Sequence, residues 1–352
     1  MRVVLADPPA YTPFYDAPLA AALARAGADV ELVTSPFRFG EVEPPEGYRR
    51  RELFYPVSSR LFRRSPLRIP LKLLEHPVGM GLLALRPADV LHVQWLAAPQ
   101  LDRVLLRPRV PAVLTAHDLL PRRTAHRRGL WRSLFGRFVR IVVHSGRGLE
   151  TLAAFGVPRE KLRVIPIPAF RRDVERRDDG RTVLFFGVIR PYRGLGDALT
   201  AIEGIRDARL IVAGDAVEPL EPYRGRADGR VEWRLGYLPE AEVDRAHAEA
   251  TVAVFPYRPE IDQSGSLLRA LGSGVPAVVY DVGGLAEPVA RFGAGRVVPA
   301  GDVGGLAAAL RELLDDADAL AAARAGAERA RAELTWDASA AAHLALYREL
   351  AG

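Results

Sequence analysis

Residues 251–287 contain the pattern that most constrains the fold of this chain. Residues 252–255 form a short apolar run, as in a strand that is buried on both faces of a sheet. A polar loop follows, and the apolar residues after Ser264 have helical spacing until Gly274. Residues 275–280 resemble the next strand. Strand, loop, helix and strand in this order predict one unit of a parallel sheet.

The start of the helix in this stretch is suited to an anion. Ser264 is expected to cap the helix by accepting hydrogen bonds from first-turn amides. The free amides and the helix dipole favour negative charge there, and the small residues 264–266 allow a phosphate to approach the backbone. Since most helix N-termini bind nothing, an ordinary crossover turn without a ligand is the alternative.

Composition limits the class of protein. A length of 352 residues predicts two domains, each with its own core. The chain has no cysteine, which excludes disulfides and thiolate metal sites and fits a reducing compartment. No leader pattern and no apolar run of about 18 residues is present. We therefore expect a cytoplasmic protein that is neither secreted nor membrane-spanning.

The formal charge is divided unequally along the chain. Residues 1–170 contain 26 Lys and Arg and 14 Asp and Glu, a net charge of +12, whereas the remainder has a net charge of −6. A basic N-terminal half predicts an anionic partner. In residues 38–77 basic side chains alternate with apolar ones, which suits contact with an anionic membrane face. A helix packed on its own domain is the alternative, and prolines 66, 70 and 77 are expected to break any long helix. No nucleic-acid motif is present.

The N-terminal half alternates strands and helices. Strands are expected near residues 3–6, 30–34, 89–94, 112–116, 140–144 and 163–167, and a first helix over about 19–26. The first loop has no glycine, which disfavours a nicotinamide-dinucleotide site. His117 follows a strand and precedes Asp118, so it is a candidate ligand-contacting residue, although a single histidine is more often structural.

The second half repeats the same organisation after a linker marked by Pro166, Pro168 and the charged residues 171–181. Residues 182–189 form a strand that contains Gly187 and is followed by RPYRG and a helix. Arg190 and Arg193 therefore lie beside a second helix N-terminus, which is a stronger signal for an anion than either feature alone.

Six segments together resemble family 4 of the retaining glycosyltransferases, which have the GT-B fold. FFGVIRPYRGL and PYRPEIDQSGSLLRALGSGVPAVVYDVGGLAE carry most of the resemblance, in the subgroup with Gln-Ser-Gly, and VLTAHD, IVVHS, GYLPEAEV and TWDASAAAHLALY match in order. The resemblance implies an α/β fold with two Rossmann-like domains facing across a cleft. The expected parts are an acceptor domain at 1–172, a donor domain at 173–334 and a terminal helix at 335–352 that crosses back to the first domain.

The family implies transfer of a sugar from a nucleoside-diphosphate sugar to a glycan or lipid-linked acceptor, without a metal or other cofactor. By the resemblance His117 contacts the transferred sugar, Arg190 and Arg193 hold the pyrophosphate with Gly187 nearby, and Tyr237 and Leu238 lie near the base. The remaining donor-site residues that the resemblance implies are Gln263, Ser264, Gly265, Ser266 and Glu287. Peripheral contact with the inner membrane face is an additional expectation, and nucleic acid is not an expected partner.

The sequence departs from the family pattern in the donor loop. A glutamate that binds the ribose hydroxyls falls here on Arg269, and a cation cannot accept their hydrogen bonds. Its usual partner falls on Ile261, and either Glu260 or Asp262 is expected to act near the sugar instead. These departures motivate an alternative, a non-catalytic GT-B protein that serves as scaffold or partner of an active glycosyltransferase. Another reaction of a nucleotide sugar, such as epimerisation, is a third possibility.

Overall fold

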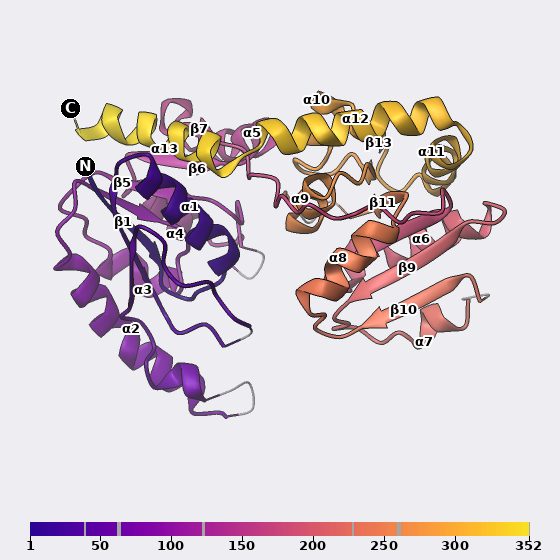
Figure 1. The fold of residues 1–352 in the computed structure, drawn as a ribbon. Coiled ribbons are helices and arrows are strands. Elements are labelled where there is room, and N and C mark those ends of the chain that lie inside the picture. The colour runs from indigo at the N-terminus through magenta and orange to yellow at the C-terminus, as the bar shows by residue number, and fades with distance from the viewer. Residues whose placement is uncertain (39, 62–64, 122–123, 227–228, 259–261, 352) are drawn as a thin grey trace. The chain divides into compact units, whose positions relative to one another are not determined.

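The chain folds into two compact α/β units. The computed structural model describes residues 1–38, 40–61, 65–121, 124–226, 229–258 and 262–351. One unit comprises Met1–Pro166 together with the C-terminal helix that begins at Trp336, and the other comprises Ile167–Thr335 (Figure 1). The predicted α/β class with two parallel sheets is confirmed. The domain limits 1–172, 173–334 and 335–352 stay a proposal.

The first unit is built on a seven-stranded parallel sheet in the order β3-β2-β1-β4-β5-β6-β7. Its strands are β1 (Arg2–Asp7), β2 (Asp29–Thr34), β3 (Arg49–Glu52), β4 (Val90–Val93), β5 (Ala112–Thr115), β6 (Arg140–Val143) and β7 (Leu162–Val164). Its helices are α1 (Pro13–Arg25), α2 (Arg68–Ala84), α3 (Pro99–Leu105), α4 (Arg128–Phe135), α5 (Gly146–Phe155) and α13 (Trp336–Ala351), with short 3-10 turns η1 (Ser58–Arg60) and η2 (Arg159–Lys161).

The second unit has a six-stranded parallel sheet in the order β10-β9-β8-β11-β12-β13. Its strands are β8 (Thr182–Phe186), β9 (Arg209–Gly214), β10 (Val231–Leu235), β11 (Val252–Phe255), β12 (Ala277–Tyr280) and β13 (Gly295–Val298). Its helices are α6 (Leu195–Glu203), α7 (Glu221–Arg224), α8 (Glu240–Glu249), α9 (Gly265–Gly272), α10 (Ala286–Phe292), α11 (Val303–Asp315) and α12 (Ala317–Glu333), with the 3-10 turn η3 (Pro191–Arg193).

Both sheets reverse their strand order at one point. In the first unit the reversal lies between β1 and β4, and in the second between β8 and β11. The central strands are buried along their length, which explains their continuous apolar runs. In open α/β sheets of this kind, ligands bind at the carboxyl ends of the strands beside the reversal. The loops that follow these four strands are therefore the first places to look for a site.

Local signals in the sequence define several helix starts correctly. Ser264 accepts from Leu267 N at 3.2 Å, as predicted, and Ser145 caps α5 by accepting from Gly148 N at 2.8 Å. The first helix, however, begins at Pro13 rather than near residue 19, because a proline at the first position needs no amide partner.

The expectation that prolines prevent a long helix between residues 66 and 84 is wrong. Helix α2 has 17 residues and continues through Pro77, while Pro70 lies in its first turn, where no amide partner is needed. His76, Gly79 and Met80 are buried, so packing against the rest of the first unit outweighs the hydrogen bond that Pro77 removes. Among the described residues, no helix is both long enough and apolar enough to cross a bilayer.

Candidate functional site

Two loops meet beside the reversal of the second sheet. The first follows β8 and contains Gly187 and Arg193. The second follows β11, contains Tyr257 and Ser264, and leads to Ser266 in the first turn of α9. Because β8 and β11 are neighbours in the sheet, their carboxyl ends bring these loops together. The position is the one at which open α/β sheets bind their ligands.

Arg193 is the centre of this cluster. Its Nη1 donates to Ser266 Oγ at 3.0 Å and to the Tyr257 hydroxyl, and its guanidinium carbon lies 4.9 Å from the centroid of the Tyr257 ring. Within the described part of the chain, Arg193 Nε is buried and has no hydrogen-bond partner. Arg193 is thus a fixed, partly desolvated cation with donor capacity left for an anion.

Gly187 leaves the space that Arg193 occupies. Its φ of +118° is unfavourable for any residue with a side chain. A Cβ at this position would lie 2.4 Å from Arg193 Nη1 and 2.5 Å from Ser266 Oγ. Both atoms are ends of side chains, so a methyl group here would displace the two polar groups rather than the backbone.

Tyr257 is a functional candidate that the sequence reasoning did not identify. It is fully buried, and its hydroxyl lies 3.2 Å from Ser264 Oγ as well as contacting Arg193. Burial raises the pKa of Tyr257 and the charge of Arg193 opposes this, so the hydroxyl stays protonated at neutral pH. Its place directly after the Pro256 that ends a buried strand was the only signal available in the sequence.

The other predicted donor residues lie on the same unit but are not drawn into this cluster by side-chain contacts. Arg190 is exposed and precedes the 3-10 turn η3, and Tyr237 is exposed while Leu238 packs on the core. Gly265 and the half-buried Gln263 flank Ser264 at the start of α9, and Glu287 lies in the first turn of α10, exposed.

Of the two acids predicted to act near the sugar, the structure describes Asp262 but not Glu260. Glu260, like the neighbouring Ile261, lies outside the described residues. Asp262 is half-buried, and its carbonyl oxygen accepts from Gly284 N at 2.7 Å. This bond ties the loop after β11 to the loop after β12, so Asp262 is held beside the turn that leads to Glu287.

Arg269 is held by ion pairs with helix α8. Its Nη2 lies 2.8 Å from Glu240 Oε2 and 2.7 Å from Asp244 Oδ1, and Arg172 also pairs with Asp244 at 2.7 Å. The arginine at the position of the expected ribose-binding glutamate therefore connects α9 to α8. Its charge is balanced by these carboxylates.

His117 belongs to a cluster of rings in the first unit. It follows β5, stacks on Trp95 with centroids 5.3 Å apart and an interplanar angle of 14°, and contacts the Tyr15 ring edge-on at 4.8 Å. Burial lowers the pKa of His117 well below its usual range, and the neighbouring His144 lowers it further. His117 is therefore neutral at physiological pH.

The proton positions in this cluster follow from its acceptors. His144 Nδ1 lies 2.8 Å from the carbonyl oxygen of Ile165, so this nitrogen carries the proton, and burial lowers the pKa of His144 to about 4. His144 Nε2 is then an acceptor, and it lies 3.2 Å from His117 Nδ1, which must donate. His117 Nε2 lies 3.0 Å from Gln94 Oε1. An unprotonated Nε2 at this place requires the flipped orientation of the Gln94 amide, in which the amide nitrogen donates to it.

Among the described residues, no group of three His, Asp or Glu side chains is arranged to hold a metal ion.

Comparison with known proteins gives two family matches that together span most of the chain. A family model described as "Glycosyltransferase Family 4" matches residues 18–168, and one described as "Glycosyl transferases group 1" matches residues 180–316. The first match lies in the unit with His117, and the second covers the cluster around Arg193.

Individual relatives are more distant. The chain is 30% identical over 200 residues to D-inositol 3-phosphate glycosyltransferase of Jonesia denitrificans, covering 52% of this chain and 47% of that protein. It is 29% identical over 220 residues to GDP-mannose:glycolipid 4-beta-D-mannosyltransferase of Xanthomonas campestris pv. campestris, covering 59% and 58%. The matches thus span about half the length of these curated relatives. Sucrose-phosphate synthase from Thermosynechococcus elongatus has the same fold, with a TM-score of 0.74 over 99% of both chains at 19% identity.

Proposed function

Because the chain belongs to the family 4 glycosyltransferases of the GT-B fold, we propose that it is a retaining glycosyltransferase. It moves a sugar from a nucleoside-diphosphate sugar to a glycan or lipid-linked acceptor, and it does so without a metal. The name of the Xanthomonas relative, which states a nucleotide-sugar donor and a glycolipid acceptor, supports this substrate class.

The observation that carries the proposal is the cluster of Arg193, Tyr257 and Ser266 at the sheet reversal. It places one fixed cation and two hydroxyls beside the start of α9, where free backbone amides favour an anion. A diphosphate bound there would accept from the guanidinium, from Ser266 and from the amides of Gly265 and Ser266. The exposed Arg190 adds a second cation on the same loop.

This arrangement supplies the stabilisation that the reaction needs. When the bond between the sugar and the diphosphate breaks, negative charge grows on the leaving group. Prepositioned cations and amides stabilise that charge more than the charge of the intact donor, which lowers the barrier. Arginine here stabilises the negative charge on the leaving diphosphate, a role that a divalent metal ion has in many other phosphate-binding sites.

The other residues keep the roles that the family resemblance gives them, as proposals. Tyr237 and Leu238 lie near the base, Gln263 and Ser264 support the start of α9, and Glu287 contributes to the nucleoside. His117 contacts the transferred sugar, and Glu260 or Asp262 acts near it. The ion pairs of Arg269 give that residue a structural role, so its presence does not favour the non-catalytic alternative.

Titration of UDP, GDP and ADP by calorimetry tests the donor site. We expect the wild-type protein to bind at least one of them. Arg190→Ala should weaken that binding by about 10-fold, because a charge-assisted hydrogen bond contributes about 1.5–3 kcal/mol. Failure of the wild-type protein to bind any of the three would overturn the proposed function. Transfer or slow donor hydrolysis by the wild-type protein, lost in His117→Ala, would exclude the non-catalytic alternative.

We also propose that helix α2 contacts an anionic membrane face. Helix α2 exposes several large apolar side chains, namely Ile69, Leu73, Leu74, Val78, Leu82 and, just beyond its end, Leu85. Residues 1–170 carry a net charge of +12, which complements anionic lipid. Apolar side chains backed by basic charge are what an interfacial helix needs.

Vesicle co-sedimentation tests this contact. The wild-type protein should bind phosphatidylcholine vesicles that contain phosphatidylglycerol more than vesicles of phosphatidylcholine alone. Leu74→Gln combined with Val78→Gln should weaken binding at least 10-fold, because each side chain contributes about 1.5–3 kcal/mol when buried in the interface. Val104→Gln, at another exposed apolar residue, in α3, is the control. Equal binding by the double variant and this control would contradict the proposal.

A further inference from the structure

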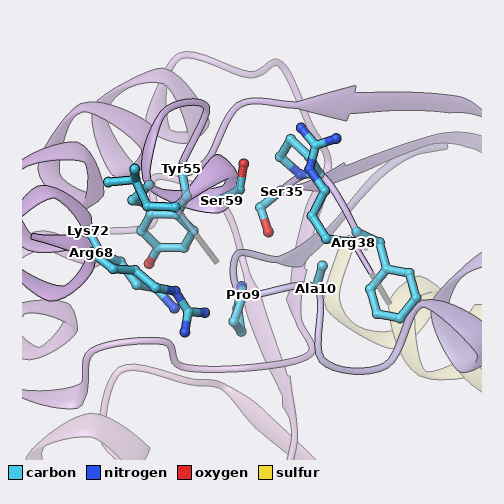
Figure 2. A pocket seen from close by; sticks show the side chains of 12 residues that line it. Pro9, Ala10, Ser35, Arg38, Tyr55, Ser59, Arg68 and Lys72 are labelled. Atoms are coloured by element: carbon cyan, nitrogen blue, oxygen red, sulfur yellow. The ribbon is translucent and has the colours of Figure 1, made fainter. Parts of the chain in front are cut away.

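A second cationic pocket lies in the first unit, at the carboxyl ends of β1, β2 and β3. It has about 530 Å³ of empty space and is open to solvent. Figure 2 shows Arg68 and Lys72 on one side of it, Arg38 on the other, and the hydroxyl groups of Ser35 and Ser59 between them. None of the described residues that line the pocket is Asp or Glu.

The three cations of this pocket lack the carboxylate partners that several other arginines of the same unit have. Among the described residues no ion pair involves Arg38, Arg68 or Lys72, whereas Arg49, Arg51 and Arg86 of the same unit all pair with acids. Lys72 is partly buried, and its ammonium lies 4.5 Å from the centroid of the Tyr55 ring. Burial lowers the pKa of Lys72, and the charge of Arg68 lowers it further. The negative charge of a bound anion would oppose these shifts by stabilising the ammonium form of Lys72.

The pocket wall is held in place from behind by a buried chain of hydrogen bonds. The Tyr55 hydroxyl donates to His76 Nδ1 at 2.7 Å, and His76 Nε2 donates to Asp102 Oδ1 at 2.6 Å. Asp102 thereby sets the tautomer of His76, and His76 fixes the Tyr55 ring under Lys72. His76 and Asp102 are almost fully buried, so this support is shielded from solvent.

The backbone of the pocket is strained in two places. Only three residues other than glycine have positive φ in the described ranges, and two of them, Ala10 at +53° and Tyr55 at +54°, line this pocket. A positive φ is unusual for a residue as bulky as tyrosine and persists only where the surrounding structure enforces it. Ser59 Oγ, also in the wall, is buried without a hydrogen-bond partner among the described residues. Strain and an unused hydroxyl at one place are typical of a ligand site.

We propose that the pocket formed by Arg38, Arg68, Lys72 and Ser59 binds a phosphate group of the acceptor. Three cations and a hydroxyl donor match the charge and the several acceptor oxygens of a phosphate better than those of a single carboxylate. The carboxyl ends of β1, β2 and β3 are the ligand-binding edge of an open α/β sheet. That the phosphate belongs to an acceptor rests on the proposed transferase function, whereas the binding of phosphate does not.

Calorimetric titration of inorganic phosphate and of glycerol 3-phosphate tests the pocket directly. Both should bind the wild-type protein, and Arg68→Gln and Lys72→Gln should each weaken binding at least about 10-fold, as expected for loss of a charge-assisted hydrogen bond. Arg103→Gln removes an exposed arginine of the same unit outside the pocket and should leave binding unchanged. Thermal unfolding of each variant establishes that it is folded, and phosphate should raise the melting temperature of Arg68→Gln and Lys72→Gln less than that of the wild-type protein.

The source of the phosphate is decided by two further arms. Tighter binding of glycerol 3-phosphate than of inorganic phosphate would assign the pocket to a soluble phosphomonoester. Displacement of bound phosphate by phosphatidylglycerol vesicles, but not by phosphatidylcholine vesicles, would assign it to a lipid headgroup. Either result supports a phosphate site. No phosphate binding, or equal binding by Lys72→Gln and Arg103→Gln, overturns it.

The same variants separate this inference from the proposed function. Lys72→Gln should bind UDP, GDP or ADP as the wild-type protein does, because Arg193 and its partners lie in the other unit. Absence of nucleotide binding in the wild-type protein would overturn the donor claim and leave the phosphate result standing. Absence of phosphate binding in a wild-type protein that binds nucleotide normally would overturn the phosphate site and leave the donor claim standing.

Discussion

Gly187→Ala should leave the protein folded and weaken binding of the nucleoside diphosphate by about 10–100-fold, as expected for displacement of a guanidinium and a hydroxyl from a charged ligand. The added methyl group would lie 2.4 Å from Arg193 Nη1 and 2.5 Å from Ser266 Oγ. Both are mobile ends of side chains, so they move away and the site loses its geometry. Calorimetry with UDP, GDP and ADP measures the loss.

Gly180→Ala is the matched control for the backbone. Gly180 also has positive φ, +74°, but a Cβ there would meet no atom within 4 Å. This variant should lose roughly 1–2 kcal/mol of stability from the unfavourable φ and bind nucleotide normally. If both variants bind nucleotide equally well, Gly187 does not protect the position of Arg193, and the diphosphate site lies elsewhere.

Acid should destabilise the protein between about pH 6.5 and pH 4. Burial lowers the pKa of His144, His247 and His343 to about 4 each. The unfolded chain takes up protons near the ordinary histidine pKa while the folded protein does not, so the free energy of unfolding falls as pH falls through this window. Each histidine can contribute up to about 3 kcal/mol to the loss.

Urea unfolding at several pH values, followed by tryptophan fluorescence, measures this effect. His247→Gln should flatten the pH dependence in the second unit, where Trp233 is the reporter, because a glutamine side chain does not titrate. His126→Gln, at an exposed histidine, should leave the pH dependence unchanged. An identical pH dependence in wild-type protein and His247→Gln would show that His247 is not responsible.

Much of the fold could be read from the sequence because it depends on local patterns. The apolar runs that became β1, β8 and β11 are continuous because these strands are covered on both faces. Ser264 caps its helix as expected, and Ser145 caps α5 in the same way, since a cap is a contact over three residues. The motifs around Arg190 and Ser264 identified the family, which the comparisons confirm.

The errors came from elements whose stability is not local. The edge strand Arg49–Glu52 is a run of charged residues, so it lacks the apolar pattern that predicts the other strands. It exists because it pairs with β2 and because Arg49 and Arg51 reach Asp29 and Glu31. Helix α2 continues through Pro77 for a similar reason, since its buried residues Met80 and Leu83 belong to the core of the first unit.

For the segment 251–287, the sequence by itself determined the strand, the helix cap and the helix start that suits an anion. Only the tertiary structure decided which groups complete that site. Tyr257 and Ser266 meet Arg193 because β8 and β11, nearly 70 residues apart, are neighbours in the sheet, and Arg269 turns to α8 because two carboxylates lie there. Spacing along the chain records local geometry, whereas such contacts depend on how the strands are ordered in space.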